Sequence, residues 1–158
     1  MYKLLHADLV HNDFTYKEGL NVDHLPFRAY GDCEPGGLYY TDLEHIGCWF
    51  YWDTTLIADV TVPDDARVHP GPRGDKWKAD RLVLSNIRPI GPFLAQQPEA
   101  LLFKWTFGQG NIPLFDALDP QPFDLVTKLL CGEDPALWLP YAKKTPEVLA
   151  WVRQSLLE

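Results

Sequence analysis

Residues 36–50 read GGLYYTDLEHIGCWF, and this stretch decides the predicted fold. A glycine pair precedes the β-prone run LYY, which predicts a strand. Thr41 or Asp42 can then cap a short helix that runs to residue 50. Glu44 would lie in the first turn of that helix, where the helix dipole favours an acidic side chain. The stretch therefore predicts a strand that passes directly into a helix.

Further strand patterns flank this junction on both sides. Residues 2–10 mix apolar and polar side chains and predict a strand that carries His6 toward the interior. Residues 56–62, LIADVTV, end at a proline that cannot donate to a ladder, and they give the clearest strand pattern in the chain. Residues 82–84, LVL, predict a short buried strand, and residues 86–89 either continue it or form a turn.

Turn signals fill the intervening segments. Gly19, Asn21 and Pro26 predict that residues 13–27 form a loop or a short helical turn. Residues 64–75 are polar and turn-rich and are expected to form a connection.

The pattern changes after about residue 92. Residues 119–132, 134–141 and 145–157 are expected to be helical, with cap-then-proline starts at Asp134 and Thr145. We expect one α+β domain over residues 1–158, in which residues 1–95 form a mainly β core and residues 96–158 a mainly helical appendage.

Composition excludes several classes of protein. The chain has 158 residues, 46% hydrophobic and 23% charged, which is ordinary globular usage and argues against disorder. Its net charge of -8 argues against nucleic acid as a partner, since phosphate contacts need Lys and Arg. Three cysteines without CxxC spacing fit a reducing, intracellular compartment. The apolar runs are too short for a signal peptide or a membrane span.

Two polar clusters contain side chains of the kinds that bind metal ions. Asp59, Asp64 and Asp65 could bind Mg²⁺ or Ca²⁺ through carboxylate oxygens, but a simple Asp-rich turn explains residues 63–66 better. A second set matches no closed zinc spacing and predicts no metal; it comprises His24, Cys33, His45 and Cys48.

The run of four rings at residues 49–52, WFYW, cannot face one core from a single element. At least one ring is therefore expected on the surface or in a cleft, where exposed rings commonly mark a binding site.

Three residues from three predicted β segments form the candidate catalytic set: His6, Tyr39 and Asp80. Together they could hold a sugar hydroxyl, stack on a flat cationic ring and stabilise positive charge on a ribose, as cleavage of a nicotinamide-ribose bond requires. Taken singly, His6 and Tyr39 are also explained as core residues. Asp80 is equally explained as a surface partner of a neighbouring Lys or Arg.

The stretch GGLYYTDLEHIGCWF resembles the second motif of the ADP-ribosyltransferase superfamily, in which a glycine-aromatic strand of the form G-x-Y-[FYL]-[AT]-[DS] runs into a helix. The resemblance implies a split β-sheet and NAD as cofactor. It also implies that Tyr39 stacks on nicotinamide, that Gly37, Tyr40 and Thr41 help to bind the cofactor, and that His6 matches the family's histidine. Asp80 would stand where the family usually carries Glu.

A second resemblance covers roughly residues 10–90. The order FTYKEGLN, then CxPGGLYYTD, VPDDA and KWKADRLVL resembles a group of uncharacterised proteins from large DNA viruses. For a viral protein, the expected location is the host cell cytoplasm.

Two functions are expected from these observations. The first is an ADP-ribosyltransferase-like protein that binds NAD or a related nucleotide and transfers ADP-ribose to a macromolecule. The second is a non-enzymatic acidic module that binds a protein partner with a basic surface.

Overall fold

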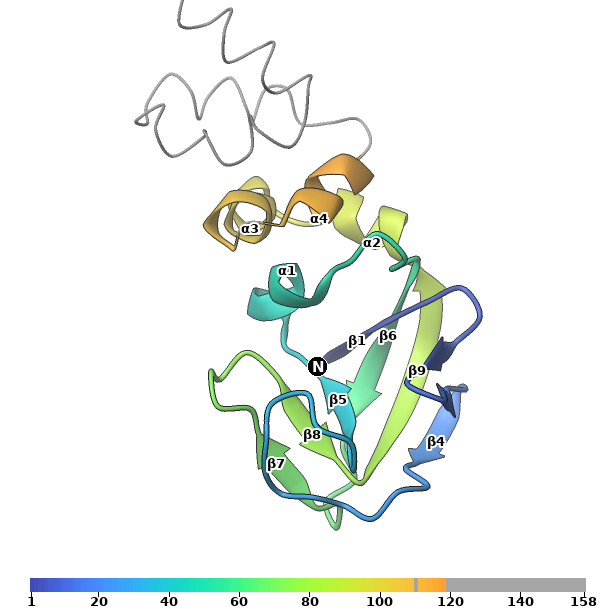
Figure 1. Cartoon of the computed structure of the whole chain (residues 1–158). Helices are drawn as coiled ribbons and strands as arrows, with labels where there is room; N and C mark the ends of the chain where they lie inside the picture. The colour runs from blue at the N-terminus through green and yellow to red at the C-terminus, as the bar shows by residue number, and fades with distance from the viewer. Residues whose placement is uncertain (110, 119–158) are drawn as a thin grey trace, which may run out of the picture. The chain divides into compact units, whose positions relative to one another are not determined.

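Antiparallel sheets and short helices make up the described part of the chain. The computed structural model describes residues 1–109 and 111–118. Its larger sheet has the strand order β1-β6-β9-β4, with every neighbouring pair antiparallel (Figure 1). The strands are β1 Tyr2–Leu5, β4 Gly19–Val22, β6 Leu56–Thr61 and β9 Arg81–Pro89. The α+β class and the strand predicted at residues 56–62 are confirmed.

The second sheet has the order β5-β8-β7, and its strands are Leu38–Tyr40, Trp77–Ala79 and Val68–Pro70. It meets the larger sheet at an isolated bridge, where the backbones of Tyr2 and Thr41 exchange hydrogen bonds of 2.8 and 2.9 Å. This bridge places the start of β1 beside the end of β5. A separate hairpin pairs β2, Val10–His11, with β3, Phe14–Thr15.

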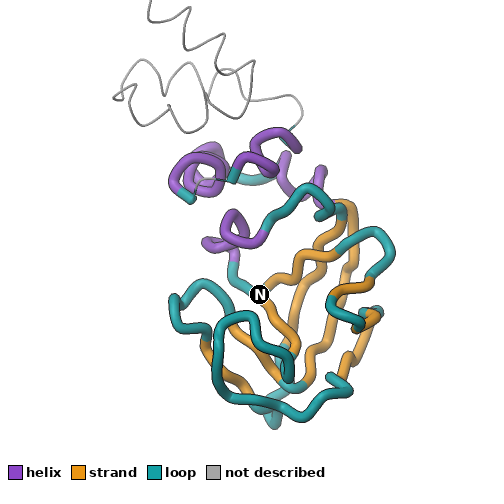
Figure 2. Tube along the Cα trace, in the orientation of Figure 1, coloured by secondary structure: helices purple, strands orange, loops and turns teal. Residues whose placement is uncertain are grey.

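Short helices gather at one end of the larger sheet (Figures 1 and 2). Apolar side chains from these helices pack with Ile57 of β6 into one buried cluster, which includes Ile46, Phe93, Leu94 and Trp105. A second cluster lies between the strands and includes Leu5, Leu38, Leu82 and Leu84. The helices are α1 Ile46–Trp49, α2 Ile90–Ala95, α3 Glu99–Phe103, the π-helix η2 Lys104–Gly108 and α4 Ile112–Ala117.

Two loop predictions were wrong. Residues 13–27 contain β3 and β4, and residues 64–75 contain β7. In β4 the turn-type residues serve the strand: Gly19 starts it at φ 87°, and the Asn21 side chain bonds the backbone of Lys17 in both directions, at 2.8 and 2.9 Å. Pairing with β9 therefore overrides local turn preference. Residues 86–89 continue β9 rather than turning.

The helices predicted at residues 119–132, 134–141 and 145–157 lie outside the described residues, so the single-domain organisation stays a prediction. Within the described residues, every helix is too short or too polar to cross a bilayer.

Candidate functional site

A pocket of about 310 Å³ lies where β1 and β5 meet. Its lining residues come from β1, β2, β5 and α1 and from the segments that precede β3, β5, β6 and β8. Five aromatic residues form part of its lining: Tyr2, Tyr39, Tyr40, Trp49 and Tyr51. Basic side chains form another part, contributed by Lys3, His6, His11 and Lys76.

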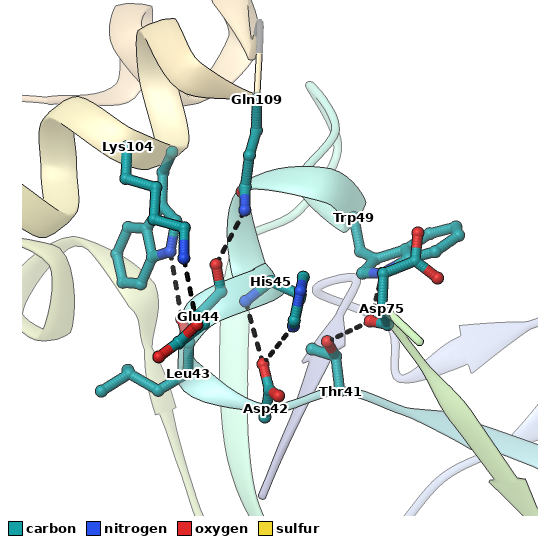
Figure 3. Close-up of polar contacts among 10 residues, drawn as sticks. Thr41, Asp42, Leu43, Glu44, His45, Trp49, Asp75, Lys104 and Gln109 are labelled. Atoms are coloured by element: carbon teal, nitrogen blue, oxygen red, sulfur yellow. Dashed lines mark hydrogen bonds and ion pairs between the residues drawn. The ribbon is translucent and has the colours of Figure 1, made fainter. Parts of the chain in front are cut away.

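The strand-to-helix junction predicted from residues 36–50 positions one of these rings. After β5, the Asp42 carboxylate accepts from the His45 backbone N–H at 3.0 Å and caps the 3₁₀ turn Leu43–His45, labelled η1, which continues into α1 (Figure 3). The Asp75 carbonyl then accepts from both Thr41 Oγ1, at 2.7 Å, and Trp49 Nε1, at 2.9 Å. The prediction of a capped helix is confirmed, and its last residue faces the pocket.

Lys3 is a buried lysine of the pocket wall. Lys3 is only 6% exposed, and its Nζ donates to the Tyr39 carbonyl oxygen at 2.7 Å. The ammonium also lies 4.3 Å from the centre of the Tyr16 ring. Burial lowers the pKa of Lys3 to about 7, because desolvation disfavours the charged amine. Near neutral pH this group can therefore be neutral or charged, and an anion beside it would favour the charged form.

Lys76 lies between two rings. Its Nζ is 4.8 Å from the centre of the Tyr39 ring and 4.3 Å from that of Trp49, a cation-π arrangement. Nζ also contacts Asp32 Oδ1 at 2.5 Å and Cys33 Sγ at 2.6 Å. Burial alone would lower the pKa of Lys76, but the hydrogen bonds to Asp32 and Cys33 outweigh it and raise the pKa. Lys76 is therefore a charged group that orders the rings around it.

Two histidines complete the basic side of the pocket. His6 Nε2 lies 3.3 Å from Asp53 Oδ2, and its ring meets the His11 ring edge-on at a centre distance of 5.3 Å. Burial, followed by the charges of Lys3 and His6, lowers the pKa of His11. His11 is consequently neutral at pH 7, and one of its ring nitrogens can accept a hydrogen bond.

The structure brings together part of the predicted set. His6, Tyr39, Tyr40 and Thr41 all line the pocket. Tyr39 donates its hydroxyl to the Glu34 carbonyl at 2.8 Å, which fixes the ring against the preceding loop.

Asp80 and Gly37 are not among the residues that line the pocket. Asp80 accepts from Arg67 Nε and from the Arg67 backbone N–H, both at 3.0 Å. Burial alone would raise the pKa of Asp80, but these bonds outweigh it and lower the pKa. Gly37 donates its backbone N–H to Asp23 at 2.6 Å and has φ 140°, where a side chain would press on Lys78. Both residues thus have structural partners away from the cavity.

The acidic cluster is divided among arginines. Asp59 pairs with Arg88 at 3.1 Å and Asp65 with Arg81 at 3.0 Å. Among the described residues, no three or more His, Cys, Asp or Glu side chains are arranged to hold a metal ion.

The four consecutive rings divide between core, pocket and surface. Phe50 is 3% exposed, Trp49 lines the pocket, and Tyr51 and Trp52 are 56% and 69% exposed. The prediction that at least one ring lies on a surface or in a cleft is confirmed.

Sequence reasoning missed Lys3, His11 and Lys76 as pocket residues. For Lys3 a signal was present: in β1 it alternates with Tyr2 and Leu4 and shares its buried face with Leu5, so a lysine stands at an inward position. For His11 and Lys76 no local pattern exists, because long-range pairing alone brings them to the pocket.

Comparison with known proteins gives relatives in a large DNA virus, as expected from the motif order. Three proteins of Acanthamoeba polyphaga mimivirus, each described as a "Putative ankyrin repeat protein", are 33%, 30% and 29% identical to the chain over 92, 94 and 87 residues. These matches cover 52%, 56% and 52% of the chain but only 30%, 46% and 26% of the relatives. The chain thus spans less than half the length of each. No family model and no solved structure matches it.

Proposed function

We propose that the pocket at the β1–β5 bridge binds a nucleotide, with a flat ring against Tyr39 and a phosphate among the basic side chains. One observation carries the proposal. In a chain of net charge -8, the described residues that line this cavity include two lysines, two histidines and no Asp or Glu, although Asp32 and Asp53 contact Lys76 and His6 from outside the lining.

The charge of the lining favours an anionic ligand. Lys76 is charged, and Lys3 has a pKa near 7 that a neighbouring phosphate would raise. Ammonium groups donate charge-assisted hydrogen bonds to phosphate oxygens. Binding energy would come from groups that are already held in place, which reduces the entropy lost on association.

The rings of the lining favour a planar group on the same ligand. Tyr39 and Trp49 are fixed by hydrogen bonds to backbone carbonyls, at 2.8 and 2.9 Å. Fixed rings make good stacking platforms, worth about 1–3 kcal/mol for each base. A cavity of about 310 Å³ lies at the small end for ligand sites, so it suits the ring, ribose and one phosphate of a mononucleotide, or the same part of a larger nucleotide such as ADP-ribose.

The pocket supports binding more than ADP-ribosyl transfer. Cleavage of a nicotinamide-ribose bond builds positive charge on the ribose, which a basic cavity would oppose. The acid predicted to stabilise that charge, Asp80, pairs with Arg67 outside the lining. The likeness to ADP-ribosyltransferases, including the split sheet, NAD as cofactor and the transfer reaction, stays a prediction.

The relatives suggest how such a domain is used. An ankyrin repeat is built from two helices, whereas the described residues form antiparallel sheets with short helices at one end. We therefore propose that the segment shared with the mimivirus proteins is a separate module that accompanies their repeats.

Isothermal titration calorimetry with a matched ligand series tests the proposal. AMP and ADP-ribose should bind, while adenosine and nicotinamide riboside, which lack phosphate, should bind at least tenfold more weakly. Lys76→Met should reduce the preference for phosphate. Lys17→Met, which removes an exposed lysine outside the pocket, should not. Equal affinity for nucleotide and nucleoside would contradict the proposed phosphate site.

A second candidate is the acidic interaction module. Ankyrin repeats commonly form binding surfaces. The exposed rings of Tyr51 and Trp52 beside the 65% exposed Asp53 side chain provide an aromatic and acidic patch that suits a basic protein partner.

A further inference from the structure

The Cys33 thiol and the Lys76 amine approach more closely than a hydrogen bond requires. Sγ and Nζ are 2.6 Å apart. An N–H···O bond spans about 2.7–3.2 Å, and sulfur is larger than oxygen, so an N–H···S bond should be longer still. A direct N–S bond would be shorter than a disulfide bond of about 2.05 Å. The observed separation suits two atoms that are joined through one small atom.

We propose that Cys33 and Lys76 form an oxidative N–O–S cross-link, in which one oxygen atom bridges Sγ and Nζ. The site is a modification site within the pocket, and its co-reactant is dioxygen or a peroxide. The proposal is independent of nucleotide binding, because it depends only on these two side chains and their surroundings.

The surrounding structure holds the two groups in place. Cys33 has φ 62°, a left-handed conformation that non-glycine residues adopt only when neighbouring contacts impose it. Its loop is tied to the second sheet by two bonds: Lys78 donates to the Tyr30 carbonyl at 2.9 Å, and Tyr39 donates to the Glu34 carbonyl at 2.8 Å. These bonds hold the loop that carries Cys33 close to Lys76.

The oxidant can reach the Cys33 thiol, and a carboxylate lies beside the Lys76 amine. Cys33 is exposed, so a small oxidant can reach its sulfur, whereas the Lys76 side chain is only 4% exposed. Asp32 Oδ1 lies 2.5 Å from Nζ and is partly exposed, so it can relay to solvent the proton that the Lys76 ammonium must lose before the neutral amine reacts. These three residues form a compact set that couples an accessible thiol to a sheltered amine and a base.

The reaction balances with either oxidant. With dioxygen, the thiol loses its S–H hydrogen and the neutral amine loses one N–H hydrogen. One oxygen atom becomes the bridge, and the other leaves as water with these two hydrogens. Sulfur and nitrogen are each oxidised by two electrons, and dioxygen takes up all four. With hydrogen peroxide, two molecules are consumed and three molecules of water are released. A thiol reductant reverses the link.

The cross-link would change the pocket directly. Lys76 would lose its ammonium charge between the Tyr39 and Trp49 rings, and the loop at residue 33 would be fixed to the segment before β8. Oxidation should therefore raise the melting temperature, because the bridge closes a long loop in the unfolded chain.

Mass spectrometry of the full chain after treatment with hydrogen peroxide tests the proposal. The expected product is a cross-linked peptide pair that joins Cys33 to Lys76, heavier by one oxygen atom and lighter by two hydrogen atoms than the unmodified pair. Dithiothreitol should restore the separate peptides and reverse the increase in melting temperature.

Matched variants make the result specific. Cys33→Ser and Lys76→Arg should both lack the product, while Cys48→Ser and Lys17→Arg should keep it. Loss of two hydrogens without gain of oxygen would indicate a direct N–S bond and overturn the proposal. Conversion of wild-type Cys33 to sulfinic or sulfonic acid without any cross-link would overturn it as well.

Discussion

The ammonium of Lys3 donates to the backbone carbonyl of Tyr39 at 2.7 Å. This contact joins the edge strand of the larger sheet to the strand that carries the predicted stacking ring. Burying a charge that has no counter-charge beside it costs free energy. If Lys3 only filled space, an apolar residue would therefore be the more stable choice. A lysine at this place in the pocket wall suits a ligand whose negative charge offsets the cost of desolvation, as the proposed phosphate would.

The buried amine predicts a specific pH dependence of stability. The pKa of Lys3 is about 7 in the folded chain and 10.5 in its unperturbed state, so the unfolded chain binds the extra proton between these values. Wild-type stability should therefore rise with pH in this window and reach its full value only above pH 10.5. Relative to Lys3→Met, the free energy of unfolding should rise by about 2 kcal/mol from pH 7 to pH 9. Urea unfolding of both proteins at pH 7 and pH 9 measures this difference. An equal change in the free energy of unfolding in the wild type and in Lys3→Met would contradict the lowered pKa.

Alanine substitutions at Gly47 and at Gly91 test the packing of α1, the helix that carries Trp49. A Cβ on Gly47 would lie 2.6 Å from Trp105 Cα, so Gly47→Ala should destabilise the protein by about 1–3 kcal/mol through overpacking. Gly91 is also helical but has no atom within 4 Å of its Cβ position, so Gly91→Ala should stabilise by about 0.5–1 kcal/mol. Thermal unfolding compares the two, and similar effects at both sites would refute the packing at α1.

Removing the ring of Tyr39 should weaken nucleotide binding. Tyr39→Leu should lose about 1–3 kcal/mol of binding free energy for ADP-ribose, the value of one stacking platform. Tyr39→Phe keeps the ring and loses only the bond to Glu34, so its affinity should lie closer to that of the wild type. Calorimetry measures both, with Trp52→Leu as a control for an exposed ring outside the pocket. An unchanged affinity in Tyr39→Leu would place the ligand elsewhere.

The interaction module makes a separate prediction. A protein partner with a basic surface, recovered by pull-down from a host lysate, should associate more slowly at 0.5 M than at 0.05 M salt, as the Debye length falls from about 14 Å to about 4 Å. Dissociation should change little with salt and should accelerate in Trp52→Ala, because ring contacts are insensitive to screening. Association that ignores salt would argue against electrostatic steering by the acidic chain.

The local parts of the fold were predictable from sequence. The junction at residues 36–50 contains its own signals, a glycine pair, a β-prone run and a capping Asp42, and the structure forms it as expected. Residues 56–61 form a strand from their own apolar pattern. In contrast, the sequences of β4 and β7 resemble loops. These segments become strands because they pair with β9 and β8, which lie far away along the chain.

The pocket was only partly predictable for the same reason. The sequence predicts His6 and Tyr39 as site residues, and the Tyr2–Thr41 bridge brings β1, which ends one residue before His6, beside the strand of Tyr39. Asp80 also lies next to a strand, but it pairs with Arg67 and does not line the pocket. Local sequence cannot distinguish these cases, because the partner of each side chain lies far away along the chain: Lys76 meets Cys33 across 43 positions.

Titration of ¹⁵N-labelled protein with ADP-ribose, followed through its tryptophan indole resonances, tests the nucleotide site most directly. Trp49 lines the pocket through a ring held by its bond to Asp75, whereas Trp105 is fully buried and donates to the Leu43 carbonyl. Spectra of Trp49→Phe and Trp105→Phe assign the two signals. A nucleotide bound in the pocket should give a saturable shift of the Trp49 indole with little change at Trp105. A Trp49 resonance that stays unmoved at millimolar ADP-ribose would contradict it.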